Sequence, residues 1–312
     1  MITISRILCP TDFSDLSKNA LAQAVALARW YEAEITLLYV APVAITAAEV
    51  AYVPGPWLSP EMREKLRGDL HAFAQSAREQ GVTVRLDLCE GNPATEILDA
   101  ARTEAFDLIV MGTHGRHGLE AWALGSVTES VLRASPCPVL TIAPRSRLAP
   151  TARFDTILCP VDFSPTSERT AHEAGLLAAE TQSRLVLFHV IERVSGPPTP
   201  VPPGFDRQAY RADAEDNVRR RLRRLTADHR DVPEASLAWG WPDREILRSA
   251  RERSAGLIVM GAHGGPMDST LFGSTAHKVV RRASCPVLVL PARAHALREA
   301  EPEPVGVGSE ER

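Results

Sequence analysis

Short apolar runs alternate along the whole chain with longer stretches in which apolar residues recur at helical spacing. In the first half the runs predict five strands, at 6–10, 35–40, 82–88, 107–111 and 138–142. The stretches between them predict four helices, at 15–32, 60–80, 93–104 and 125–134. Strands that alternate with helices are typical of right-handed β-α-β crossovers, so we expect a parallel sheet covered by helices on both faces.

The second half repeats this order of elements. Its expected strands lie at 156–161, 184–190, 235–239, 256–260 and 286–290. Its expected helices lie at 165–182, 207–228, 243–253 and 272–282. Two proline-rich segments, 41–59 and 191–206, follow the second strand of each half, and we predict variable loops there, with a mobile flap as the alternative.

The two halves are copies of one unit. ILCPTDFS at 7–14 returns as ILCPVDFS at 157–164, and LIVMGTHG at 108–115 returns as LIVMGAHG at 257–264. A repeat of this length indicates a duplicated domain. We therefore predict an α/β protein of two tandem doubly wound domains, each with a five-stranded parallel sheet, and a tail that is disordered and acidic. The predicted boundaries are 1–146, 152–293 and 294–312.

Composition narrows the class of protein. The 312 residues carry a net charge of −4, and the segment 295–312, with five Glu and two Arg, supplies −3 of it. The remaining body is nearly neutral, so neither nucleic-acid binding nor attraction to a membrane surface is predicted. No apolar run reaches the roughly 20 residues of a membrane span. Five cysteines are too few for a disulfide scaffold. We therefore expect a cytoplasmic protein with reduced, buried thiols, and leave redox sensing open.

Glycines gather after the fourth predicted strand of the first copy. The segment 112–118 reads GTHGRHG, and Gly125-Ser126 then enters the next helix. Glycines let backbone N–H groups approach an anion, and a helix start adds free donors and a favourable dipole. Because ligands of doubly wound sheets bind beyond the carboxyl ends of the strands, we predict a phosphate site here, with simple turns as the alternative. G-x-x-x-x-G-K-[ST] and G-x-G-x-x-G are absent, which argues against Walker-type NTPases and standard dinucleotide folds.

The motif CPTDFS after the first strand, combined with Gly-x2-Gly-x9-Gly-Ser after the fourth, resembles the universal stress protein family. Gly112, Gly115, Gly125 and Ser126 match the glycine pattern of its ATP-binding branch. The resemblance spans both copies. It implies a Rossmann-like fold of the adenine nucleotide alpha hydrolase-like type. It also implies that the ligand is ATP or another adenine nucleotide, bound with or without Mg²⁺.

The resemblance implies roles for individual positions of the first copy. Asp12 matches the carboxylate on the adenosine side, with helix capping as the alternative, and Pro10 shortly before it is a candidate position as well. Val40 matches the residue whose backbone contacts the adenine edge, with a core valine as the alternative. The loop around ribose and phosphates and the helix entry that holds the phosphates are matched by Met111, Gly112, His114, Gly115, Arg116, Gly125, Ser126, Val127 and Thr128.

The second copy departs from the pattern. Eight residues instead of nine separate Gly264 from Gly273, and Asp268 adds a negative charge to that loop. We therefore expect the first copy to bind nucleotide better. The candidate positions of the second copy are Asp162, Val190, Gly261, His263, Gly264, Gly273, Ser274 and Thr275.

Three functions are compatible with these residues. The leading prediction is a nucleotide-binding stress-response or signalling module whose partner contacts change with occupancy, and any ATP hydrolysis would be slow because no general base or nucleophile is assembled. The alternatives are an adenylating or nucleotide-hydrolysing enzyme and a nucleotide-free scaffold. We expect the two domains to form an intramolecular pseudo-dimer. The resemblance favours contact through the last strands, near 139–142 and 287–290. A homodimer and an unknown protein partner stay open.

Overall fold

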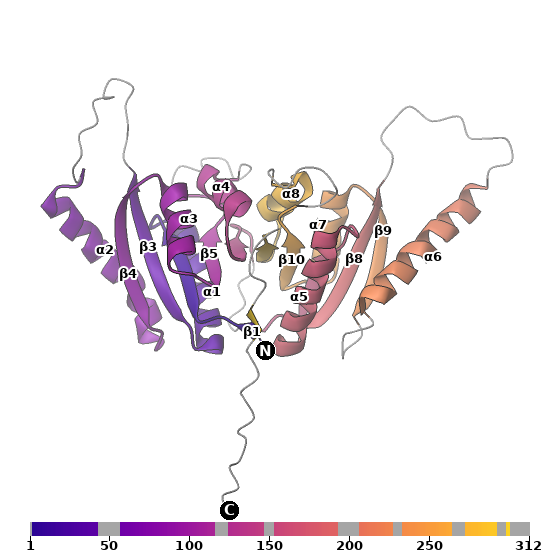
Figure 1. Ribbon diagram of the computed structural model, residues 1–312, viewed down its shortest axis with the longest axis horizontal. Helices are drawn as coiled ribbons and strands as arrows, with labels where there is room; N and C mark the ends of the chain where they lie inside the picture. The colour runs from indigo at the N-terminus through magenta and orange to yellow at the C-terminus, as the bar shows by residue number, and fades with distance from the viewer. Residues whose placement is uncertain are drawn as a thin grey trace, which may run out of the picture.

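The computed structural model describes residues 2–42, 57–115, 124–146, 153–192, 206–226, 233–263, 272–291 and 298–299 (Figure 1). The elements of the first half are β1 (Ile2–Thr3), β2 (Arg6–Thr11), α1 (Asp15–Tyr31), β3 (Glu34–Pro42), α2 (Pro60–Glu79), β4 (Val84–Gly91), α3 (Pro93–Thr103), β5 (Leu108–Gly112), α4 (Ser126–Ala134) and β6 (Val139–Ile142). Those of the second half are β7 (Thr156–Pro160), α5 (Pro165–Thr181), β8 (Arg184–Glu192), α6 (Arg207–Thr226), β9 (Glu234–Gly240), α7 (Pro242–Glu252), β10 (Leu257–Gly261), α8 (Ser274–Arg282), β11 (Val287–Leu290) and β12 (Arg298–Glu299). The predicted alternation of strands and helices is confirmed in both halves.

Ten strands form one sheet in the order β4-β3-β2-β5-β6-β11-β10-β7-β8-β9. Neighbouring strands within each half are parallel, as predicted. The halves meet at β6 and β11, which pair antiparallel with Leu140 opposite Leu288. The hydroxyl of Thr141 also donates a 3.1 Å hydrogen bond to the carbonyl oxygen of Val287. The two five-stranded sheets are therefore continuous, and the expected contact through the last strands is confirmed.

Side-chain alternation along the strands divides the core into two layers. On β2, Ile7 and Cys9 belong to the layer that packs against α1, α2, α5 and α6. Leu8 belongs to the opposite layer, which packs against α3, α4, α7 and α8. Helices therefore cover both faces of each half, and α2 and α6 lie at opposite ends of the molecule (Figure 1). Buried strands with helices on both faces are the doubly wound arrangement that the sequence predicts.

The strand order creates one crevice in each half. In the first half, β2 has β3 on one side and β5 on the other, so the chain winds in opposite directions from β2. Ligands of open α/β sheets bind beyond the carboxyl ends of the strands at such a switch point. The second half has the same reversal between β7 and β10.

One pairing was not predicted. Strand β12 lies within the expected disordered tail and pairs antiparallel with β1. The rest of that tail, 294–297 and 300–312, lies outside the described residues, as do 43–56 and 193–205 of the two proline-rich segments. No helix in the described ranges is both long and apolar enough to cross a membrane.

Candidate functional site

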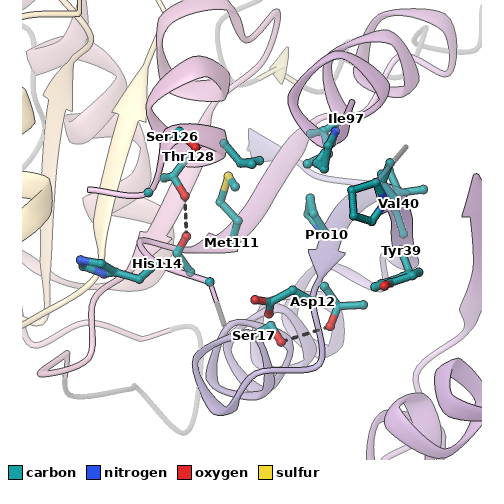
Figure 2. A pocket seen from close by; sticks show the side chains of 18 of the residues that line it. Pro10, Asp12, Ser17, Tyr39, Val40, Ile97, Met111, His114, Ser126 and Thr128 are labelled. Carbon is teal, nitrogen blue, oxygen red and sulfur yellow. Dashed lines mark hydrogen bonds between the residues drawn. The ribbon is translucent and has the colours of Figure 1, made fainter. Parts of the chain in front are cut away.

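A cavity of about 700 Å³ lies at the carboxyl ends of β2, β3 and β5, where the strand order reverses (Figure 2). Eleven of the twelve positions predicted for the first copy line it: Pro10, Asp12, Val40, Met111, Gly112, His114, Gly115, Gly125, Ser126, Val127 and Thr128. The twelfth, Arg116, lies outside the described residues. Residues as far apart in the sequence as Pro10 and Thr128 therefore converge on one space.

The sharp turn after β2 fixes the position of Asp12. Phe13 adopts a positive φ of 63°, and Ser14 then caps α1 by accepting a hydrogen bond from the backbone N–H of Ser17. Asp12 Oδ1 accepts a 3.0 Å hydrogen bond from the N–H of Ser14. The carboxylate thus stabilises the turn before α1, whose cap is Ser14 and not Asp12, and it also lines the cavity.

Gly115 brings the backbone of the loop against this carboxylate. A Cβ atom at Gly115 would lie only 2.8 Å from Asp12 Oδ2. Real Cβ atoms essentially never approach other atoms so closely, so a larger residue here would displace the carboxylate. The glycine therefore lets the loop backbone lie against the Asp12 carboxylate without moving it.

The first turn of α4 faces the cavity without a side-chain cap. Gly125 is its N-cap residue and has no side chain that could accept from the first-turn N–H groups. Its own N–H donates a 2.9 Å hydrogen bond to the carbonyl oxygen of Thr113. A Cβ atom at Gly125 would lie 3.2 Å from that same oxygen. Open N–H donors at a helix start favour an anion, which is the physical basis of the predicted phosphate site.

The side chains of Thr128 and His114 contact residues at the end of β5 and just after it. The hydroxyl of Thr128 donates a 2.9 Å hydrogen bond to the carbonyl oxygen of Gly112. The ring of His114 lies with Nδ1 2.8 Å from the hydroxyl of Thr113. Figure 2 shows that this ring is directed away from Asp12. His114 lines the cavity, and in this conformation its Nδ1 is engaged with the neighbouring Thr113 hydroxyl.

Sequence reasoning missed eight residues of the cavity. The apolar residues among them form a wall beside Val40 and Met111 (Figure 2). The polar residues stabilise the turn after β2. The hydroxyl of Thr11 accepts a hydrogen bond from the N–H of Phe13 and donates one to Ser17 Oγ. Most of the eight lie within two residues of a predicted position or at the start of α3, and Ser17 lies in the first turn of α1. They are Thr11, Ser17, Leu38, Tyr39, Pro42, Pro93, Ile97 and Leu124.

The second half contains a smaller cavity, of about 480 Å³, at the equivalent place. Seven of the eight predicted positions line it: Asp162, Val190, Gly261, His263, Gly273, Ser274 and Thr275. The eighth, Gly264, lies outside the described residues together with Asp268 and the shortened loop.

The two cavities differ in chemistry. Glu192 adds a carboxylate to the second one, where the first has Pro42. His189 replaces Tyr39 and has Nδ1 2.7 Å from the carbonyl oxygen of Val161. Burial lowers the pKa of His189, an effect that the Val161 hydrogen bond partly offsets, so the ring carries less positive charge near neutral pH. The second cavity is therefore smaller and more acidic than the first.

Relatives of known sequence match one or both halves. A protein described as universal stress protein MJ0531 of Methanocaldococcus jannaschii is 38% identical over 139 residues, which are 44% of this chain and 81% of that protein. Universal stress protein Rv2005c of Mycobacterium tuberculosis is 27% identical over 238 residues, 75% of this chain and 78% of that protein.

Some solved structures span both halves, and others align with about one half. A universal stress protein from Archaeoglobus fulgidus aligns with 91% of this chain and 97% of its own at a TM-score of 0.64 and 25% identity. A universal stress protein in complex with cAMP aligns with 44% of this chain and 97% of its own, at a TM-score of 0.34 and 23% identity. The model of the universal stress protein family matches residues 3–143 and again 153–291. With two matches that cover most of its length, the chain belongs to the universal stress protein family.

Proposed function

We propose that the chain binds an adenine nucleotide, ATP in preference, in the cavity of the first half, and that occupancy changes its contacts with a partner in a stress response. One observation supports this most strongly: the uncapped start of α4, the glycine loop and an apolar wall share one space at the switch point of the sheet. Anion donors beside an apolar slot suit a ligand with both phosphates and a flat base.

Each part of the cavity has a distinct task in this proposal. The first-turn N–H groups of α4 and the exposed hydroxyl of Ser126 would hold phosphate oxygens. Asp12 would accept a hydrogen bond from a ribose hydroxyl, because a carboxylate only accepts. The side chains of Val40 and Met111 would pack against the base, for which they offer apolar surface.

Occupancy of the second cavity is proposed to be weaker. Polyphosphate carries several negative charges, and Glu192 and Asp162 both line that space. Like charges at short range oppose binding. The smaller volume of about 480 Å³ also leaves less room for the ligand.

The test uses the purified full chain. Acid extraction followed by chromatography identifies any nucleotide that copurifies, and calorimetric titration measures affinity for ATP, ADP, AMP, cAMP and adenosine, each with and without Mg²⁺. The proposal expects ATP binding at the first cavity with negligible turnover. Steady turnover would favour the enzyme alternative instead, and the absence of both copurified nucleotide and measurable binding would favour the scaffold.

A further inference from the structure

Two hydrogen bonds tie the first turn of α4 to the end of β5. The Thr128 side chain is part of this turn, is 3% exposed, and donates through Oγ1 to the carbonyl oxygen of Gly112 at 2.9 Å (Figure 2). The N–H of Gly125 donates to the carbonyl oxygen of Thr113, also at 2.9 Å. The helix start is thus held against the strand by bonds that do not involve the residues between 115 and 124.

This geometry is incompatible with Thr128 as a hydrogen-bond donor to phosphate. A hydroxyl has one proton, and the proton of Thr128 is directed to Gly112. Phosphate oxygens only accept, so the bonded hydroxyl has nothing left to offer them. The open N–H groups of the first turn do have protons to offer, and their direction depends on how the helix start is held.

The second domain provides a natural comparison. The N–H of Gly273 donates to the carbonyl oxygen of Ala262 at 2.9 Å, so the backbone bond that corresponds to Gly125–Thr113 is present. Ala276 stands in place of Thr128 and has no hydroxyl. The start of α8 therefore has the backbone tie and lacks the side-chain tie.

We propose that Thr128 is a positioning residue whose hydroxyl acts as a latch between α4 and β5 and thereby sets the affinity for the phosphate part of the ligand. The proposal rests on the nucleotide binding proposed above. Donors held in place before binding cost less ordering when the ligand arrives, which raises affinity without a new contact. The missing latch at Ala276 is then one reason for weaker phosphate binding in the second domain.

The first experiment separates phosphate binding from general structure. Thr128→Val keeps the shape of the side chain and removes the hydroxyl, and Thr128→Ser keeps the hydroxyl. Both are made in a full chain with Val190→Trp, whose large side chain fills the second cavity. We expect Thr128→Val to weaken ATP binding about five- to tenfold, which corresponds to the typical net free energy of one hydrogen bond. Binding of adenosine, which has no phosphate, is expected to stay within about twofold, and Thr128→Ser to restore ATP binding.

The second experiment installs the latch. Ala276→Thr is made in a full chain with Val40→Trp, which fills the first cavity, and Ala276→Val serves as the control of equal shape. We expect Ala276→Thr alone to strengthen ATP binding by the second domain, about fivefold. This arm stays informative even where Thr128→Val fails to fold.

The possible outcomes have separate meanings. Equal losses of ATP and adenosine in Thr128→Val would overturn the latch in favour of a general packing role. Unchanged ATP binding in that variant, or equal gains from Ala276→Thr and Ala276→Val, would overturn it as well. A wild-type chain that binds neither ligand would instead overturn the proposed nucleotide binding, and the role of Thr128 with it.

Discussion

At the scale of single residues, a substitution at Gly115, which lies against Asp12, should change the affinity for ATP but not the stability of the fold. The atom that a Cβ would meet at 2.8 Å is the end of the Asp12 side chain, which can move without disturbing the backbone. We expect Gly115→Ala to weaken ATP binding by the first domain about tenfold, equivalent to ~1.4 kcal/mol. The free energy of unfolding should change by less than about 0.5 kcal/mol. Calorimetric titration and urea unfolding measure the two quantities.

Gly68 provides the matched control for this substitution. It lies exposed within α2, and a Cβ atom there would meet nothing within 4 Å. Gly68→Ala should stabilise the protein by about 0.5–1 kcal/mol, because alanine favours the helix and loses less backbone entropy on folding. ATP affinity should not change. Similar affinities for wild type and Gly115→Ala would contradict the role given to the glycine.

The cysteines give a second prediction at this scale. Burial raises the pKa of Cys9, Cys137, Cys159 and Cys285 to about 12. Cys89 is only half-buried, and burial followed by the charges of Glu96 and Asp87 raises its pKa to about 11. Thiolate is the reactive form, so all five should react slowly at neutral pH. We expect iodoacetamide to label Cys89 first in the native protein. Mass spectrometry of peptides taken at successive times measures the rate at each cysteine. Rapid labelling of Cys9 would support the redox alternative instead.

Residue identity in the candidate site could be predicted, while side-chain direction could not. The glycine spacing identifies the loop because it marks places where the backbone comes close to its neighbours: a Cβ atom at Gly115 or Gly125 would lie 2.8 or 3.2 Å from the nearest atom. Which way His114 and Thr128 turn depends on acceptors that only the folded chain brings near, such as the carbonyl oxygen of Gly112. The apolar wall was missed for a related reason, since Ile97 is indistinguishable in sequence from any other core residue of a helix.

At the scale of elements, the start of α3 and the start of α7 differ in one cap. Asn92 caps α3 by accepting from the N–H groups of Ala94 and Thr95, at 3.0 and 3.2 Å. Trp241 occupies the same position before α7 with a similar backbone conformation, makes no side-chain cap bond and is 47% exposed. We expect Trp241→Asn to stabilise the protein by about 1 kcal/mol and Asn92→Ala to destabilise it by about 0.5–2 kcal/mol.

Urea unfolding of the two variants and the wild type checks this pair. Both substitutions lie outside the residues that line the cavities, so ATP affinity is a control that should remain constant. A destabilised Trp241→Asn would mean that the packing of the exposed indole outweighs the missing cap.

Helices and strands could be told apart from the sequence because the apolar pattern indicates which face is buried. The first and last residues of a helix could be predicted only where a typical capping residue is present. Ser14 marks the start of α1 as a typical N-cap residue. Its end has no such mark, because Glu32 adopts the left-handed conformation with φ of 55°, which usually favours glycine. Gln182 does the same after α5. The two-residue strands β1 and β12 are too short for any periodicity.

At the scale of the whole molecule, the duplication determines two similar sheets but leaves open how they join. Every strand next to the centre is apolar, so alternation cannot show which edge meets its copy. The contact through β6 and β11 followed from the family resemblance. The pairing spans only three residue pairs, with Leu140 and Leu288 opposite each other on one face and 3% and 5% exposed. This leucine pair is therefore a direct place to test how strongly the β6–β11 contact couples the two halves.

A double-mutant cycle tests this dependence. Leu140→Ala and Leu288→Ala should each destabilise the protein by about 2–5 kcal/mol, as buried leucines do. Because the two side chains are cross-strand neighbours, the double variant should deviate from additivity by at least ~0.5 kcal/mol. Leu140→Ala combined with Leu185→Ala, on β8 and three strands from β11, should be additive within about 0.5 kcal/mol. Calorimetric unfolding measures both cycles. Additivity in the Leu140–Leu288 cycle would show that contacts other than this leucine pair hold the two halves together. The antiparallel pair of β1 and β12 would then be the next contact to test by deletion.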